Sequence, residues 1–477
     1  MDDKAVLILN GVNGATGDYL LGPLELRDIG AIVKGETPDA NHVRELQAWW
    51  ERVSVEHLGP VEGIDPTDLA QTGWGVVFPA RSDPAIVAAL QPLLDLRRQQ
   101  VGTDLAHGFR IFADVDGVRP GESKTTFLAR HGVGFGPADP EKMPYYLLLV
   151  ADPDAIPYRF QYELDVTYAV GRVHFDSVEG YANYARSVVE AETHSAPRPP
   201  RAAFVGVRNG GDRATELSAD HLITPLAAQL TYEQTDWTFD VRLADEATKV
   251  AFGQVLGGVD TPTLLFTASH GMGFPEGHPR QLPDQGALLC QDWPGPLQWR
   301  QPIPSDFYFA AADVGDDARL GGLIAVLFAC YGAGTPRLDD FAHQALHAPT
   351  AIAPHAFLAQ LPQRLLAHPA GGALAVVGHI DRAWGYSFAW PRVGEQLGAL
   401  KSMLLRLLNG HPVGSAMEYL NQRYAELSSV LSAELEDVKW GKQSDDVELA
   451  GLWTANNDAR SYVVVGDPAA RLSVTSL

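Results

Sequence analysis

The sequence predicts an α/β protein with a mostly parallel sheet between two layers of helices, and two observations carry this prediction. Short runs that are apolar throughout recur along the chain, as in YYLLLVA at 145–151 and LIAVLFA at 323–329. Segments with helical spacing of apolar residues separate these runs, as in SADHLITPLAAQL at 218–230. Fully apolar strands are typical of parallel sheets that helices cover on both faces.

The expected elements follow one another along the chain. Amphipathic helices are expected at 40–58 and 84–100, ahead of the first strand. The predicted strands are 145–151, 168–173, 202–208, 237–244, 261–269, 323–329, 372–378 and 461–466. Residues 394–436 fit a helical hairpin joined at NGHPVG, inserted before the closing strand.

Composition excludes several classes of function. Lys and Arg number 36 against 59 Asp and Glu, for a formal net charge of -23. This balance disfavours nucleic acids and anionic membranes as partners, because both are bound mainly through basic side chains. Two cysteines, Cys290 and Cys330, form neither a disulfide framework nor a zinc-ligand pattern. We therefore expect no metal and no cofactor. Without a signal peptide or a membrane-spanning run, we expect a soluble, cytoplasmic protein.

Two predicted strands end in residues that can carry chemistry. TLLFTASHG places His270 and Gly271 directly after one strand, and LIAVLFAC places Cys330 directly after another. Strand ends of open α/β sheets gather at one edge, where a His and a Cys can form a nucleophile and its base. The amides of Gly271 and Cys330 are natural oxyanion donors. A lone buried Cys or His is usually structural, so the prediction rests on the pair.

The motifs resemble those of caspase-like (clan CD) cysteine peptidases, and the gingipain-type (C25) branch most closely. The strand–His-Gly and strand–Ala-Cys motifs are shared. Three further segments also resemble that branch: 144–173, 372–388 with its Trp384, and the closing SYVVVGDPAARL at 461–472. The resemblance implies a caspase-like sheet. It divides the chain into an N-terminal region of uncertain role (1–130), a first subdomain (131–200), a catalytic subdomain (201–390), and a helical hairpin with the closing strand (391–477).

The resemblance also implies roles for individual residues. Cys330 would attack the scissile carbonyl of a peptide or protein substrate, with His270 as acid and base. Asp152, or else Asp154, would orient His270; the structural alternative for both is a turn or a cap. An acidic pocket would favour Arg or Lys before the cleaved bond, at the P1 position. The candidate pocket residues are Asp165, Glu163, Asp381 and Trp384, and the alternative for Asp165 is a bond to Arg172 or to a backbone amide.

Other functions stay open at the level of sequence. The peptidase is expected to be intracellular and regulated. It could be a signal- or partner-gated effector, for example in bacterial defence, that stays silent until an activating ligand or partner binds. A non-catalytic binding module is a further alternative, although the intact His and Cys disfavour it. Gly11, Gly14 and Gly17 weakly resemble a dinucleotide-binding turn, but Pro23 stands where the required helix would run.

Overall fold

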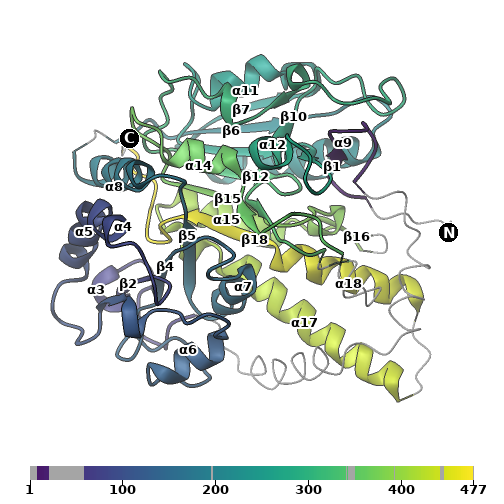
Figure 1. The fold of residues 1–477 in the computed structure, drawn as a ribbon. Coiled ribbons are helices and arrows are strands. Elements are labelled where there is room, and N and C mark those ends of the chain that lie inside the picture. The colour runs from purple at the N-terminus through teal and green to yellow at the C-terminus, as the bar shows by residue number, and fades with distance from the viewer. Residues whose placement is uncertain are drawn as a thin grey trace.

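A computed structural model describes residues 8–20, 59–194, 197–339, 341, 350–390, 393–440 and 445–475. Within these ranges the central sheet has ten strands, in the order β3-β2-β4-β5-β18-β15-β12-β8-β6-β7 (Figure 1). Their bounds, in that order, are Phe109–Phe112, Trp74–Val77, Tyr146–Val150, Ala169–Val173, Tyr462–Gly466, Ala375–His379, Ile324–Phe328, Leu264–Ala268, Arg201–Gly206 and Thr238–Leu243. The mostly parallel sheet predicted from the apolar runs is confirmed.

The sheet consists of two parallel halves that run in opposite directions. Strand β18 pairs in parallel with β5 but antiparallel with β15, from Ala375 opposite Gly466 to His379 opposite Tyr462. The carboxyl ends of β8, β12 and β15 therefore lie at one edge of the sheet, and those of β4, β5 and β18 lie at the other. This reversal decides which loops can share a site.

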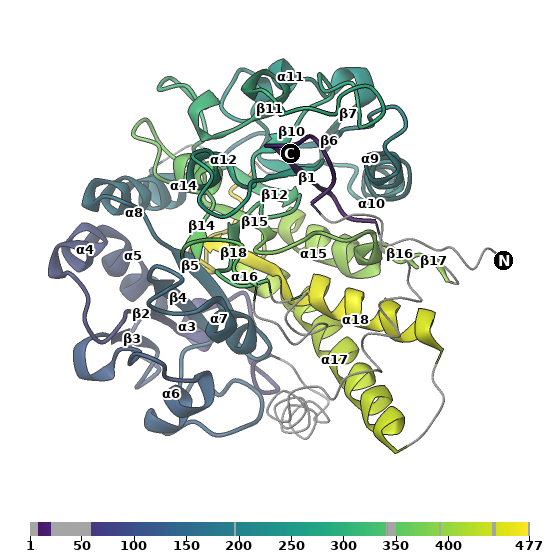
Figure 2. The ribbon, with the colours of Figure 1, turned by 45° about the vertical axis from the view of Figure 1, so that its right-hand side comes forward.

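Helices flank the sheet, as Figures 1 and 2 show. Their bounds are α3 Leu69–Thr72, α4 Pro84–Ala89, α5 Gln91–Val101, α6 Lys124–Arg130, α7 Tyr158–Asp165, α8 Val178–Thr193, α9 Arg213–Ser218, α10 Thr224–Glu233, α11 Lys249–Val255, α12 Gln281–Asp284, α14 Gln360–Leu366, α15 Gly398–Leu408, α16 Val413–Ala416, α17 Glu418–Lys439 and α18 Asp446–Arg460. The predicted hairpin corresponds to α15 and α17, and α18 packs along α17. No helix in the described ranges is long and apolar enough to cross a membrane.

The region before residue 130 contributes directly to the sheet. Strands β2 and β3 extend it beyond β4, and Asp467 at the end of β18 holds this region in place. Its carboxylate accepts hydrogen bonds from Trp74 Nε1 at 2.9 Å and from Arg97 Nε at 2.7 Å. Arg97 also pairs with Glu192 of α8 at 2.6 Å, so the buried guanidinium is fully matched by carboxylates. The helix expected at 40–58 lies outside the described residues.

A small second sheet stands at the edge where β8 and β12 end. It has the order β1-β9-β10-β11, with bounds Gly11–Asn13, Gly271–Gly273, Leu288–Leu289 and Tyr308–Phe309. Strand β1 pairs in parallel with β9, Gly11 opposite Gly271. Two short ribbons complete the strands of the described residues: β13 Gly334–Thr335 with β14 Phe357–Leu358, and β16 Ala389–Trp390 with β17 Gly394–Glu395.

Candidate active site

His270 and Cys330 follow neighbouring parallel strands of the central sheet. Strands β8 and β12 pair up to Ala268 opposite Phe328, so the two residues leave the sheet side by side. Gly271 packs directly on Cys330, because a Cβ built on that glycine would lie 1.8 Å from the carbonyl oxygen of Cys330. Only glycine tolerates this approach, which gives the His-Gly motif a physical reason. The predicted pair is thus brought together, with both side chains 0% exposed.

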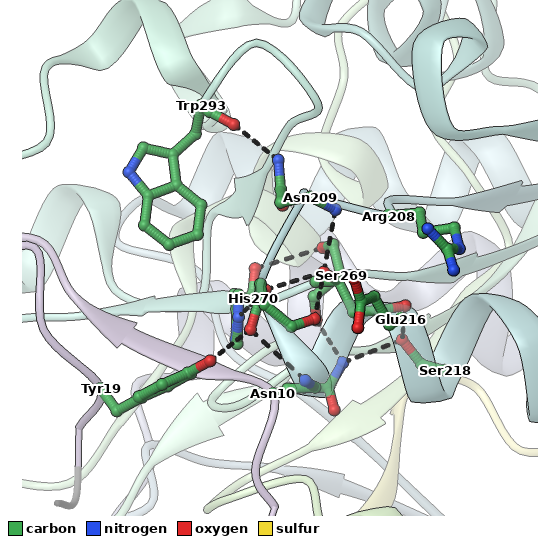
Figure 3. Close-up of polar contacts among 12 residues, drawn as sticks. Asn10, Tyr19, Arg208, Asn209, Glu216, Ser218, Ser269, His270 and Trp293 are labelled. Atoms are coloured by element: carbon green, nitrogen blue, oxygen red, sulfur yellow. Dashed lines mark hydrogen bonds and ion pairs between the residues drawn. The ribbon is translucent and has the colours of Figure 1, made fainter. Parts of the chain in front are cut away.

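The carboxylate that contacts His270 is Asp212. His270 Nε2 and Asp212 Oδ2 are 2.7 Å apart, and Asp212 also accepts hydrogen bonds from Thr215 Oγ1 at 2.7 Å and from the hydroxyl of Tyr19. Figure 3 labels His270 and Tyr19. Burial alone would raise the pKa of Asp212. The charge of His270 and these hydrogen bonds outweigh it and lower the pKa to about 2. Asp212 is therefore ionised and accepts the hydrogen carried by Nε2.

The other imidazole nitrogen has no partner. Nδ1 of His270 is buried and makes no hydrogen bond within the described residues. The rings of Tyr19 and Trp293 lie edge-on to the imidazole, with centroids 5.6 and 6.1 Å away. With the hydrogen fixed on Nε2 by Asp212, Nδ1 carries the free lone pair that a general base needs.

The structure corrects the expectation that Asp152 orients His270. Asp152 follows β4, whose carboxyl end faces the opposite edge of the sheet, and its carboxylate lies 3.5 Å from His174. It also accepts the amide hydrogen of Asp154 at 2.7 Å, which is the turn role that the sequence left as an alternative. Asp154 in turn accepts from the amide of Ala356 at 3.1 Å. The reversal at β18 could not be read from the sequence.

The sequence around Asp212 contains a pattern that is consistent with its position, although Asp212 lies outside the family motifs. It follows β6, the strand next to β8, and its side chain caps α9 by accepting from the amide of Ala214 at 3.3 Å. An acidic N-cap in the loop that follows a strand adjacent to the His-bearing strand is placed to reach the same edge. Because Asp is among the commonest N-cap residues, the cap alone explains Asp212 in the sequence and gives no sign of its contact with His270.

Two of the predicted pocket acids have structural partners. Asp165 is buried at the end of α7 and accepts the amide hydrogen of Val170 at 3.2 Å, the alternative that the sequence had left open. Burial raises the pKa of Asp165 well above its ordinary value. Glu163 pairs with Arg159 one turn earlier on the same helix, at 2.8 Å. Among the described residues, no hydrogen bond or ion pair joins either carboxylate to Cys330 or His270.

The loop that follows β15 does reach the candidate site. The carbonyl of Asp381 accepts from the amide of Tyr331 at 2.9 Å, and the amide of Ala383 lies 3.2 Å from Cys330 Sγ. The Asp381 carboxylate accepts from the Arg382 amide at 2.8 Å. The ring of Trp384 packs on Phe341, 5.0 Å between centroids. Asp381 and Trp384 thus shape the loop beside the thiol, and it is the loop's backbone that faces the thiol.

A segment of the chain's own N-terminal region occupies the site. The carbonyl oxygen of Asn10 accepts two hydrogen bonds, from the amide of Gly271 at 2.8 Å and from the amide of Cys330 at 3.0 Å. The Asn10 amide donates to the carbonyl of Ala383 at 2.9 Å, and the amide of Gly385 donates to the carbonyl of Ile8 at 3.0 Å. Leu9 pairs antiparallel with Trp384. Residues 8–10 are thus bound as an added antiparallel strand.

The glycines of this segment serve that approach. A Cβ built on Gly11 would lie 2.6 Å from Cys330 Sγ, so the backbone at Gly11 rests against the thiol. Gly14 donates its amide hydrogen to the carbonyl of Gly273 at 2.7 Å. The segment around Pro23, where a dinucleotide-binding turn would continue into a helix, lies outside the described residues. Within the described residues no cluster of His, Cys, Asp and Glu could hold a metal ion.

The thiol itself is protected by this arrangement. Burial raises the pKa of Cys330 above its ordinary value, with the amide of Ala383 as a smaller opposing influence. Among the described residues, Cys330 Sγ contacts the amide and the carbonyl of Ala383. The thiol is therefore protonated at neutral pH while residues 8–13 cover it.

Comparisons with known proteins give structural likenesses only. No family model matches the sequence, and no curated protein does. Among solved structures the chain is similar to the Arg-specific cysteine proteinase gingipain R, with 13% identity and a TM-score of 0.46 over 87% of this chain and 80% of that one. It is similar to a complex of the pro- and mature domains of RgpB from Porphyromonas gingivalis, with 13% identity and a TM-score of 0.45 over 85% and 80%. A structure described simply as a protease scores 0.46 at 13% identity over 85% and 80%.

Proposed function

We propose that this chain is a cysteine endopeptidase in which Cys330 is the nucleophile and His270 the acid and base. The observation that carries the proposal is the pair of hydrogen bonds from the amides of Gly271 and Cys330 to one peptide carbonyl oxygen, at 2.8 and 3.0 Å. Two backbone donors aimed at a carbonyl beside a thiol are the arrangement that stabilises a tetrahedral oxyanion.

In the proposed reaction each of these groups has one role. Sγ of Cys330 adds to the peptide carbonyl carbon while Nδ1 of His270 takes the thiol proton. The two amides hold the oxyanion, and the imidazolium then gives the proton to the leaving nitrogen as the C–N bond breaks. A water molecule, deprotonated by Nδ1, hydrolyses the thioester and restores the thiol. Asp212 keeps the hydrogen on Nε2 throughout and stabilises the imidazolium, which makes it a positioning residue.

The geometry also bears on the predicted specificity and regulation. The preference for Arg or Lys at P1 remains a prediction. The Asn10 side chain does not support it, because its hydrogen bonds go to Ser218 and Ser269 rather than to a carboxylate. A covered, protonated thiol supports an enzyme that is silent until residues 8–10 leave the site. This observation favours the gated form of the enzyme over one that is constantly active, without identifying what triggers it.

The test compares the wild type with Cys330→Ala and Cys290→Ala, each incubated with a peptide library whose cleavages are read by mass spectrometry. Cys290 is the matched control because it is equally buried and carries none of the proposed chemistry. We expect cleavage by the wild type and by Cys290→Ala, and none by Cys330→Ala. Cleavage that survives in Cys330→Ala would contradict the proposal.

A further inference from the structure

The peptide that fills the site is placed as a substrate would be. Ile8, Leu9 and Asn10 add to the backbone of residues 383–385 as an antiparallel strand, and the carbonyl of Asn10 lies between the two oxyanion donors. The chain then continues past the thiol as β1, in parallel with β9. The bond that follows this carbonyl is Asn10–Gly11.

The side chain of Asn10 fills a pocket of matching chemistry. It is 1% exposed, and its Nδ2 donates to Ser218 Oγ at 3.3 Å and to the carbonyl of Ser269 at 3.4 Å (Figure 3). Both groups accept from a donor on a short side chain. They come from the end of α9 and the end of β8, so a longer guanidinium or ammonium would have to displace one of these elements.

The same pocket disfavours an aspartate. Oδ1 of Asn10 is buried and has no hydrogen-bond partner among the described residues. An aspartate would place a second unsatisfied oxygen, with a charge, against the carbonyl of Ser269. The neutral carboxamide of asparagine therefore fits this pocket better than either an acidic or a basic side chain.

The position after Asn10 has a requirement of its own. A Cβ at Gly11 would lie 2.6 Å from Cys330 Sγ and 2.5 Å from Leu20 Cδ1. A residue with a side chain there would push the peptide away from the thiol. Asparagine followed by glycine thus brings the peptide bond to Cys330 and lets the backbone pass it.

We propose that Asn10–Gly11 is an internal substrate of this enzyme, that Cys330 cleaves this bond to uncover its own active site, and that the pocket formed by Ser218 and Ser269 selects asparagine at P1. This inference rests on the proposed peptidase activity. In the reaction, Sγ forms a thioester with the Asn10 carbonyl carbon, and Gly11 leaves as an amine after His270 protonates its nitrogen. Water then hydrolyses the thioester, leaving Asn10 with a free carboxylate.

The segment contains an internal control for this inference. The sequence NGVNG holds two Asn–Gly bonds, Asn10–Gly11 and Asn13–Gly14. Asn13 uses its side chain in a turn, where Oδ1 accepts the amide hydrogen of Ala15 at 2.9 Å. Spontaneous chemistry of Asn–Gly sequences would affect both bonds and would persist without the thiol. Enzymatic cleavage would be confined to the bond at Cys330.

The experiment follows the intact mass and the N-terminal sequence of the purified full-length chain over time, for wild type, Cys330→Ala, Asn10→Ala, Asn10→Asp, Asn10→Arg and Asn13→Ala. We expect a new N-terminus at Gly11 in wild type and Asn13→Ala and none in Cys330→Ala. The three Asn10 variants should be cut more slowly by about 100-fold or more, because the pocket's acceptors lose their matched donor. Faster cutting of Asn10→Arg, or cutting of Cys330→Ala, would overturn the inference.

A second arm separates this inference from the peptidase proposal. Fluorogenic peptides Ile-Leu-X, with X as Asn, Asp, Arg or Lys, are assayed with wild type and Cys330→Ala. Cys330-dependent cleavage that prefers Asn supports both. Cys330-dependent cleavage only after Arg or Lys, with no new terminus at Gly11, overturns the inference and leaves the peptidase standing. No Cys330-dependent cleavage of any peptide or of the chain itself overturns both.

Discussion

At the scale of single residues, the site depends on how Asp212 and His270 divide the work. Asp212 contacts Nε2, and Nδ1 makes no hydrogen bond among the described residues, which is the arrangement that the proposed transfer of the thiol proton requires. The sequence placed His270, Gly271 and Cys330 after apolar strands, and the structure has them after the neighbouring strands β8 and β12, while their chemical roles remain a proposal. It was not sufficient to predict Asp212, whose distance from His270 depends on the pairing order of the strands.

The variant Asp212→Asn tests whether Asp212 keeps the imidazole hydrogen on Nε2. The amide could donate its own hydrogen to Nε2, which would move the imidazole hydrogen to Nδ1 and remove the base. We expect kcat/KM for peptide cleavage to fall by about 100-fold or more, with KM little changed. A decrease confined to KM would contradict a role in holding the tautomer. Asp220→Asn, an exposed partner of Arg208 on the same stretch of chain, serves as the control.

The same carboxylate makes folding stability depend on acid. The pKa of Asp212 falls from 3.8 to about 2 in the folded chain, so its ionised form stabilises the fold above its ordinary pKa. That contribution, about 2 kcal/mol, is lost as the pH falls through the folded pKa. Urea unfolding of wild type and Asp212→Asn should therefore differ most near neutral pH and converge as the pH falls towards 2. A difference that is constant with pH would contradict the assignment.

At the scale of elements, the loop after β15 forms one wall of the site that holds residues 8–10. Ala383 and Gly385 supply its backbone groups, and Arg382 anchors it through a buried pair with Asp339, at 2.6 and 2.8 Å. The segment around Trp384 was expected at the site because it resembles a segment of the gingipain-type branch. The resemblance implied that a side chain of this segment recognises the peptide, whereas in the structure the loop's backbone contacts residues 8–10. Backbone contacts of this kind cannot be predicted from residue types.

Removing Asp339 should loosen this wall. Asp339→Ala leaves the Arg382 guanidinium buried without its bidentate partner, and we expect a loss of about 3–5 kcal/mol of unfolding free energy. The control is Asp316→Ala, which breaks an exposed pair with Arg364 and should cost about 1 kcal/mol or less. Chemical unfolding followed by circular dichroism measures both. Equal losses in the two variants would contradict the role given to the buried pair.

At the scale of the whole molecule, the antiparallel pairing of β18 with β15 joins two parallel half-sheets. Apolar runs predicted the strands and the α/β class, because a strand buried on both faces must be apolar along its length. They could not predict the reversal, since the residue pattern of a fully apolar strand does not depend on the direction in which the strand runs. The resemblance implied Asp152 beside His270, whereas the reversal puts Asp152 at the other edge of the sheet.

The strand at this junction should therefore be critical for the fold. Val464→Asp buries a charge at the centre of the sheet, where the residue is 1% exposed, and should cost about 4 kcal/mol or more, or abolish folding. Val430→Asp, on the exposed side of α17, should cost about 1 kcal/mol or less. If both variants unfolded at similar urea concentrations, β18 could not be the central strand.

If Cys330 is the nucleophile, its site should accept a peptide in the position of residues 8–10. The most direct measurement uses an Ile-Leu-Asn peptide with a thiol-reactive ketone at its carboxyl end, and peptide mapping locates the label on the full-length chain after incubation. We expect label on Cys330, none on Cys290, and none on either cysteine in His270→Ala. Label shared between the two cysteines, or an unlabelled Cys330 in a chain that has lost residues 1–10, would contradict it.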